Sequence, residues 1–187
     1  MRRGICVVVV ASLACGWLLA GAVTEASAAT GGTVNVFVTP NGSTLPKHPG
    51  KVMLTGAIGD YGTVSVATAA GKPTGKKTSK SPYRLLKLKK GTILANISTF
   101  QSKLNSAFAG TSGFNSTTCS ESIAVTGSIS VVSGTGAYVG ATGSFTMTGH
   151  FAGVTGRTSS GKCTTKTTSG SGATYASIVG TGTISVP

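Results

Sequence analysis

Acidic and histidine side chains are scarce in this sequence. Of its 187 residues only Glu25, Asp60 and Glu121 are acidic, and only His48 and His150 are histidines. Glycoside hydrolysis needs two carboxylates that converge, and a zinc site needs several His, Cys, Asp or Glu ligands. No GxSxG element, the usual setting of a nucleophilic serine in hydrolases, is present. We therefore expect a protein without catalytic residues, metal or cofactor.

Cysteine is also rare, and its positions predict one disulfide. Cys6 and Cys15 lie in a segment that we expect to be removed, which leaves Cys119 and Cys163. No histidine cluster or CxxC pair accompanies them, so a zinc site or a reactive thiol is disfavoured. In an oxidising compartment we expect the two to pair, closing a loop of about 45 residues and stabilising the fold by roughly 4 kcal/mol.

The first 28 residues have the features of a secretory signal peptide. Two arginines precede an apolar run over residues 5–23, and the small residues at 26–28 form a cleavage site. The sequence thus predicts an exported protein in which residues 29–187 form a single domain. The alternative is a membrane anchor, because residues 4–23 carry no charge over about the length that spans a bilayer.

Basic residues greatly outnumber acidic ones. The chain has 16 lysines and arginines and a formal charge of +13, which becomes +12 when Arg2, Arg3 and Glu25 leave with the signal. Such a surface attracts polyanions. Eight basic residues cluster in one run without an acid: Lys72, Lys76, Lys77, Lys80, Arg84, Lys87, Lys89 and Lys90.

This run predicts binding to an anionic cell-envelope polymer or to lipid head groups. The alternative is a solvated loop, near residues 70–82 and mobile, followed by a solvated strand face with no partner. Nucleic acid is disfavoured because only Tyr83 interrupts the run with an aromatic ring, whereas proteins that bind single strands interleave several.

Alternating apolar and polar residues predict strands over most of the chain. The clearest case is Ser122 to Phe151, two alternating arms around a glycine-rich connection. Further strands are expected at residues 33–39, 51–58, around Val64 and Val66, and at 83–90, 91–97 and 175–186. Residues 153–172 form a low-complexity loop that the disulfide would tether.

One short helix is expected between Ser98 or Thr99, either of which would cap it, and Gly110. Its predicted buried face consists of Phe100, Leu104, Ala107 and Phe108. Six to nine strands with glycines inside them favour an all-β fold, a single closed antiparallel β-barrel with this one helix. A β-sandwich is the alternative.

Four segments carry a resemblance to a known superfamily. Ser133 to Gly143, SGTGAYVGATG, resembles the glycine-rich connection of the allene oxide cyclase and dirigent barrels. Leu54 to Gly62, Leu88 to Thr92 and Ile178 to Thr183 are similar to uncharacterised exported actinobacterial proteins of this kind. The likeness covers roughly residue 51 to the C-terminus, and it implies an antiparallel barrel.

The resemblance also implies a second function, a barrel that binds an apolar small molecule and isomerises or cyclises it. The residues that would face such a ligand are Asp60, Tyr61 and Tyr138. From its position between Gly59 and Tyr61, Asp60 has a simpler interpretation, since an aspartate in a turn usually accepts hydrogen bonds from its own backbone. The sequence therefore leaves three hypotheses: a non-catalytic exported barrel that binds envelope anions, a barrel that holds a small molecule, and a purely structural envelope protein.

Overall fold

The computed structural model describes residues 31–40, 49–74, 81–110, 113–164 and 173–187. The predicted signal peptide, with Cys6 and Cys15, lies outside these residues. The elements in chain order are β1 (Gly32–Thr39), β2 (Gly50–Gly56), β3 (Asp60–Ala67), β4 (Tyr83–Leu88), β5 (Gly91–Asn96), α1 (Ser98–Ala109), β6 (Phe114–Asn115), β7 (Ser120–Gly136), β8 (Thr142–Val154) and β9 (Ala173–Ser185).

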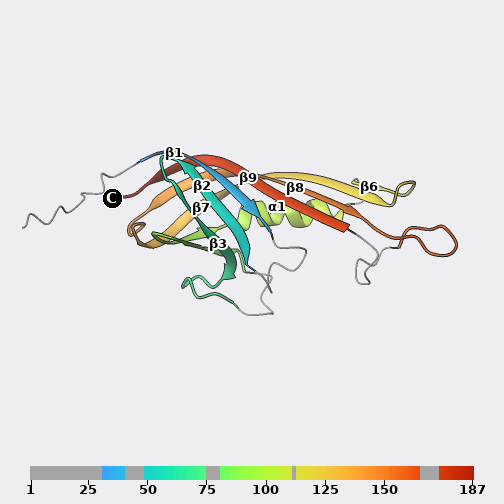
Figure 1. The fold of residues 1–187 in the computed structure, drawn as a ribbon, viewed down its shortest axis with the longest axis horizontal. Coiled ribbons are helices and arrows are strands. Elements are labelled where there is room, and N and C mark those ends of the chain that lie inside the picture. The colour runs from blue at the N-terminus through green and yellow to red at the C-terminus, as the bar shows by residue number, and fades with distance from the viewer. Residues whose placement is uncertain (1–30, 41–48, 75–80, 111–112, 165–172) are drawn as a thin grey trace, which may run out of the picture.

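The strands form one antiparallel β-barrel (Figure 1). They follow the order β5-β4-β3-β2-β1-β9-β8-β7-β6, and β5 also pairs with β7. Because these two strands meet, eight strands close the ring and only the two-residue β6 lies outside it. The expected barrel with a single short helix is confirmed, and the β-sandwich alternative is wrong, since a sandwich consists of two separate sheets.

Three strands are much longer than the others. β1 to β5 have six to eight residues each, whereas β7 has 17 and β8 and β9 have 13. In Figure 1 these three strands continue past the barrel toward β6. The paired arms of β7 and β8 are those predicted from the alternation, with Ile123 opposite Phe151 and Ile129 opposite Phe145.

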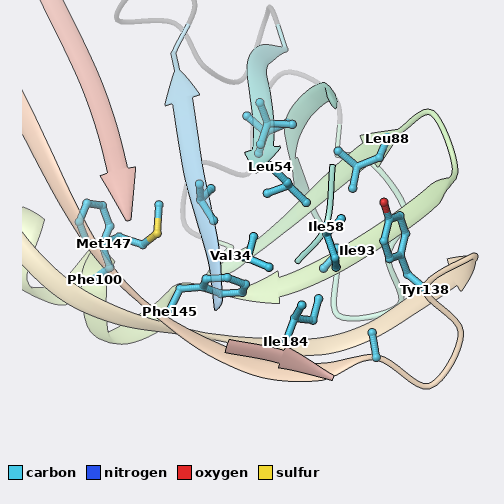
Figure 2. Close-up of a cluster of buried hydrophobic side chains, with 14 of the residues drawn as sticks. Val34, Leu54, Ile58, Leu88, Ile93, Phe100, Tyr138, Phe145, Met147 and Ile184 are labelled. Carbon is cyan, nitrogen blue, oxygen red and sulfur yellow. The ribbon is translucent and has the colours of Figure 1, made fainter. Parts of the chain in front are cut away.

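Large side chains fill the barrel interior (Figure 2), and two of them lie beside glycines of the neighbouring strand. Phe145 pairs with Gly182, and Met147 pairs with Gly180. A Cβ at Gly182 would lie 2.6 Å from Phe145 Cα, and one at Gly180 would overlap Met147 Sδ. The inward face predicted for the last strand is confirmed at its C-terminal end, where Ile184 is 1% exposed.

The helix α1 packs against the inward face of β7 and fills one side of the barrel interior. A Cβ at Gly127 would lie 2.8 Å from Phe100 Cα, so the glycine permits this close approach. Gly110 ends the helix as predicted, but the expected cap at Ser98 or Thr99 is wrong. Ile97 occupies the N-cap position and has no capping side chain, and the N–H of Ser98, the first helical residue, donates to Asn96 Oδ1 over 2.9 Å.

The predicted buried face of α1 is only partly confirmed. Phe100 is buried, and Leu104 and Ala107 pack against the core. Phe108 is 48% exposed and makes an edge-to-face contact with Phe151, with the ring centroids 5.5 Å apart.

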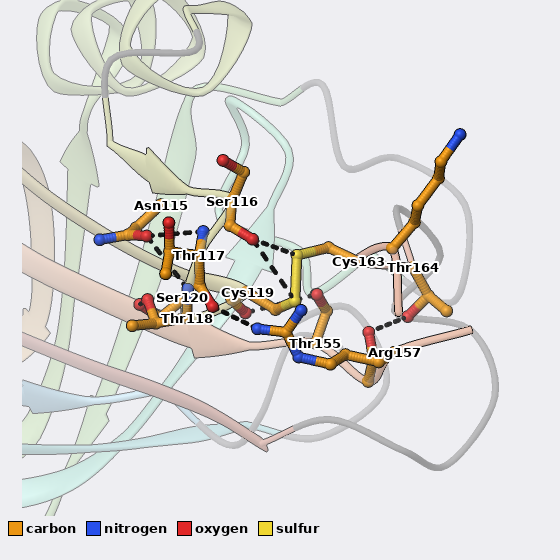
Figure 3. The surroundings of a disulfide bond; sticks show 12 residues. Asn115, Ser116, Thr117, Thr118, Cys119, Ser120, Thr155, Arg157, Cys163 and Thr164 are labelled. Atoms are coloured by element: carbon orange, nitrogen blue, oxygen red, sulfur yellow. Dashed lines mark hydrogen bonds between the residues drawn. A yellow bond between two sulfur atoms is a disulfide. The ribbon is translucent and has the colours of Figure 1, made fainter. Parts of the chain in front are cut away.

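The Cys119–Cys163 disulfide is confirmed, with an S–S distance of 2.05 Å (Figure 3). It joins the start of β7 to the segment after β8, where the Thr155 N–H donates to the Cys119 carbonyl over 2.8 Å. The predicted loop at 153–172 therefore starts later than expected, because β8 continues to Val154, and its residues 165–172 lie outside the described part.

The predicted loop near residues 70–82 is described only in part. Pro73 pairs with Ala67 as an isolated bridge, and the Thr74 N–H donates to the Val66 carbonyl over 2.9 Å. The chain after β3 therefore folds back on that strand as far as Thr74. Residues 75–80 lie outside the described part, and with them Lys76, Lys77 and Lys80.

Candidate functional site

Asp60 lies at the closed end of the barrel and is only 6% exposed. Its Oδ1 accepts hydrogen bonds from the backbone N–H groups of Tyr61 (2.7 Å) and Lys89 (3.1 Å). Its Oδ2 accepts from the Lys90 N–H (3.0 Å) and from the Tyr138 hydroxyl (2.6 Å). We call Asp60 and its four donor residues the Asp60 cluster. Asp60 thus fixes both its own turn and the turn between β4 and β5.

Electrostatics keeps this carboxyl ionised. Burial raises the pKa of Asp60, but the hydrogen bonds from Tyr138, Lys90, Tyr61 and Lys89 outweigh it, and the pKa lies below its ordinary value. Burial, together with the hydrogen bond to the Asp60 carboxylate and its charge, raises the pKa of Tyr138 well above the ordinary value for a tyrosine. At neutral pH the pair is therefore a charged acceptor and a neutral donor, which makes a strong hydrogen bond.

The carboxylate of Asp60 and the hydroxyl of Tyr138 face each other in the interior. Tyr138 is 2% exposed and lies beside Leu88 and Ile93 (Figure 2). Of the three residues that the resemblance offered as ligand contacts, Asp60 and Tyr138 bind each other. The third, Tyr61, points outward and is 60% exposed. This arrangement stabilises the barrel end, because both oxygens of the Asp60 carboxylate accept from groups of the chain itself.

A cavity of about 90 Å³ lies at the opposite end of the barrel, beside Phe100 of α1. Its walls are almost entirely apolar: Val36, Val38, Pro40, Val64, Val66, Leu86, Ala95, Ile97, Phe100, Ile129, Met147 and Ile178, with Ser65 and Arg84 as the polar members. None of these residues carries a carboxyl, imidazole or phenol group, so the lining provides binding surface without an acid or base.

Arg84 lines this cavity because it alternates with the inward residues Leu86 and Leu88 along β4. Its Nη1 donates to the carbonyls of Ser81 (2.8 Å) and Tyr83 (3.0 Å), and Nη2 donates to Gln101 Oε1 (3.1 Å). Burial lowers the pKa of its guanidinium, and these three acceptors are all neutral. The structure thus separates Arg84 from the lysines with which it was grouped in the basic run.

The described lysines of the basic run lie on the outside. Lys72, Lys87, Lys89 and Lys90 are all exposed. Lys51 of β2, which the sequence did not single out, joins them, because Lys51 pairs with Thr63 and Thr63 pairs with Lys87. Only the register between strands that are distant in the chain brings these side chains to one face.

The remaining acidic and histidine side chains in the described ranges lie far from the Asp60 cluster. Glu121 lies near the start of β7, and the Asp60 cluster lies beyond the C-terminal end of the same strand. About 50 Å of extended chain therefore separates Glu121 from the cluster. His150 is exposed on β8, and His48 lies outside the described residues. In the described part of the chain, no three His, Cys, Asp or Glu side chains gather where they could hold a metal ion.

Comparisons with known proteins add no identification. The chain matches no protein family, no curated protein and no solved structure. The class of protein is therefore defined by the fold alone, a closed eight-stranded antiparallel barrel. Within the described residues, no helix is long and apolar enough to cross a membrane.

Proposed function

We propose that this chain is an exported, non-catalytic barrel protein that binds an anionic component of the cell envelope through lysines on the outside of the barrel. The observation that carries the proposal is the face formed by Lys51, Lys87 and Lys89, on which no acid is present to neutralise the charge. Of the two acidic side chains in the described residues, Asp60 accepts hydrogen bonds from four donors, and Glu121 lies at the start of β7, at the other end of that strand from the Asp60 cluster.

Export rests on the predicted signal peptide and is compatible with the disulfide, a crosslink that persists in oxidising compartments. The predicted charge of +12 without the signal peptide would draw the protein to phosphate-bearing polymers and head groups. The described lysines would concentrate that attraction on one face of the barrel. Their ammonium groups act as point charges, so the interaction would be sensitive to salt.

The test compares two variants that lose equal charge. In Lys87→Gln/Lys89→Gln the proposed face loses two lysines, and in Lys103→Gln/Lys162→Gln two exposed lysines are lost from α1 and from the segment after β8. The probes are soluble polyphosphate and phosphatidylglycerol vesicles. We expect the first variant to bind about 30-fold more weakly, because each lysine near an anionic surface contributes about 1 kcal/mol.

The control should lose no more than a few-fold in affinity. If both variants weaken binding equally, net charge alone acts and the proposed face has no special role. If the parent protein binds neither probe, the proposal fails altogether.

A second candidate function, the binding of a small molecule inside the barrel, is supported by the cavity beside Phe100. About 150 Å³ of apolar cavity holds benzene, so about 90 Å³ suits a smaller molecule or the end of a longer one. Arg84 at the wall has only neutral acceptors, which favours a ligand with an anionic head. The lining supports binding, and offers no acid or base for isomerisation or cyclisation.

Butyrate and 1-butanol are suitable probes, since they differ only in the head group. We expect butyrate to shift the NMR methyl signals of Ile97 and Ile129, and butanol to shift them less. Ala95→Leu, which fills the cavity, should abolish the shifts, whereas Ala152→Leu on the exposed side of β8 should not. Shifts that survive Ala95→Leu would contradict binding in this cavity.

A further inference from the structure

Four exposed apolar side chains form a continuous row across the outside of the barrel. Val179 of β9 pairs with Phe37 of β1, Phe37 pairs with Met53 of β2, and Met53 pairs with Tyr61 of β3. Directly paired residues of neighbouring antiparallel strands point to the same side, about 5 Å apart. Their exposed fractions are 40%, 42%, 48% and 60%. We call these four residues the apolar row.

Lysines border the apolar row on one side and at one end. Lys89 Nζ lies 5.5 Å from the centroid of the Tyr61 ring, where the ring face attracts a cation. Lys51 is two residues from Met53 on the same strand face, and its neighbour Thr63 pairs with Lys87. The apolar row and these three lysines therefore form one surface, which we call the lysine–apolar face.

We propose that the lysine–apolar face docks the protein on an anionic lipid bilayer, which is a specific form of the anion binding proposed above and rests on it. The lysines would bind the head groups, and the apolar row would enter the boundary between head groups and acyl chains. Surface-bound proteins combine these same two elements, apolar side chains and a basic surround. Tyr61, with an apolar ring and a polar hydroxyl, suits the depth at which aromatic residues gather.

The chemistry of the apolar row favours a bilayer over the other occupants. Phe37 and Val179 have no hydrogen-bonding side-chain group, and Met53 has only a weakly accepting sulfur. A hydrated anionic polymer would gain little from covering them. A second copy of the chain would add three more lysines to the same interface, where the two sets of like charges oppose association. A bilayer with anionic lipids satisfies both parts of the surface.

The first experiment separates the two parts of the lysine–apolar face. Phe37→Ser/Met53→Ser removes apolar area and leaves every lysine, and Val132→Ser/Val154→Ser is the matched control, because both valines are exposed and lie on β7 and β8, away from the strands that carry Phe37 and Met53. We expect the first variant to bind vesicles of phosphatidylglycerol and phosphatidylcholine at least tenfold more weakly and to bind polyphosphate as the parent does. The control should match the parent with both probes.

A second measurement reports insertion directly. The only tryptophan of the sequence is Trp17, within the predicted signal peptide, so an added tryptophan serves as a local reporter. We expect Phe37→Trp fluorescence to shift to the blue and to be quenched by brominated acyl chains when anionic vesicles are added. Val154→Trp, at the end of β8, should show neither change.

The outcomes distinguish the inference from the function on which it rests. If the protein binds polyphosphate but not anionic vesicles, the function stands and docking on a bilayer is wrong. If vesicles bind the Phe37→Ser/Met53→Ser variant as tightly as the parent, or if Phe37→Trp fluorescence does not respond to bound vesicles, the apolar row does not enter the bilayer and the inference is overturned. If neither probe binds, both proposals fail.

Discussion

The Asp60 cluster and the lysine–apolar face share one short segment but use it in opposite ways. The backbone N–H groups of Lys89 and Lys90 donate to Asp60 inside the barrel end, while the side chains of both lysines are exposed. Inside, every acceptor oxygen of the carboxylate has two donors. Outside, among the described residues, the ammonium groups have no acid beside them and the four side chains of the apolar row are exposed.

This difference separates residues that stabilise the fold from residues that suit a partner. A buried charge with all its hydrogen bonds made is a structural feature, however closely it resembles an active-site carboxylate. Exposed cations beside exposed apolar side chains contribute little to stability, because surface charges interact weakly in water. Variants in the two regions should therefore change different measurements.

The largest effect on stability is expected for Asp60→Ala. The change leaves the Tyr138 hydroxyl and the N–H groups of Lys89 and Lys90 without their acceptor in a buried setting, at a cost of about 3 kcal/mol in the free energy of unfolding. Urea denaturation measures this directly. The Glu121→Ala variant, which removes a half-exposed acid, should lose less than about 0.5 kcal/mol. Equal losses in the two variants would mean that the Asp60 cluster does not stabilise the barrel end.

A change of pH should have a smaller effect on the free energy of unfolding, through the titration of Asp60 and Tyr138. Because the folded pKa of Asp60 lies below its ordinary value of 3.8, its contribution is present above that pH and is lost as the pH falls through the folded pKa. Because the folded pKa of Tyr138 is raised above 10.0, its contribution is complete below pH 10 and is lost as the pH rises through the folded pKa.

Denaturation midpoints measured across this pH range give the test. The parent protein should lose stability at both extremes, and Tyr138→Phe should flatten the alkaline loss and lower stability at neutral pH by about 1 kcal/mol, the contribution of one hydrogen bond. An alkaline loss that is unchanged in Tyr138→Phe would show that other groups cause it.

The smallest effect on stability is expected on the lysine–apolar face. Lys87→Gln/Lys89→Gln should change the free energy of unfolding by less than about 0.5 kcal/mol, because both side chains are exposed and surface substitutions seldom change stability more. Thermal denaturation of this variant beside Lys103→Gln/Lys162→Gln checks the prediction. A loss of several kcal/mol would instead place these lysines among the residues that stabilise the fold.

Much of the fold could be predicted from local pattern. Alternation identified the arms of β7 and β8, and the two remaining cysteines identified the disulfide. The same alternation places Arg84 on the inward side with Leu86 and Leu88, a signal that its membership of the basic run obscured. The start of α1 at Ser98 was predicted to within about a residue, but the capping residue was not, because Asn96 accepts from the Ser98 N–H from one position before the N-cap, Ile97.

The candidate site depends on contacts between distant parts of the chain. The hydrogen bond from Tyr138 to Asp60 joins residues 78 positions apart, and no local motif indicates it. The apolar row likewise depends on the register of four strands, the last of which follows the first by more than a hundred residues. Single exposed apolar residues such as Phe37 and Met53 are common on protein surfaces. Only their pairing across neighbouring strands reveals a continuous apolar row.

The most direct test of the proposed function is equilibrium binding to phosphatidylglycerol vesicles, measured for the parent, for Lys87→Gln/Lys89→Gln and for Lys103→Gln/Lys162→Gln at two salt concentrations. We predict tight binding of the parent that weakens in high salt, about 30-fold weaker binding of the first variant and near-parental binding of the second. Equal binding by all three proteins, or binding that does not change with salt, would contradict the proposal that this face recognises an anionic partner.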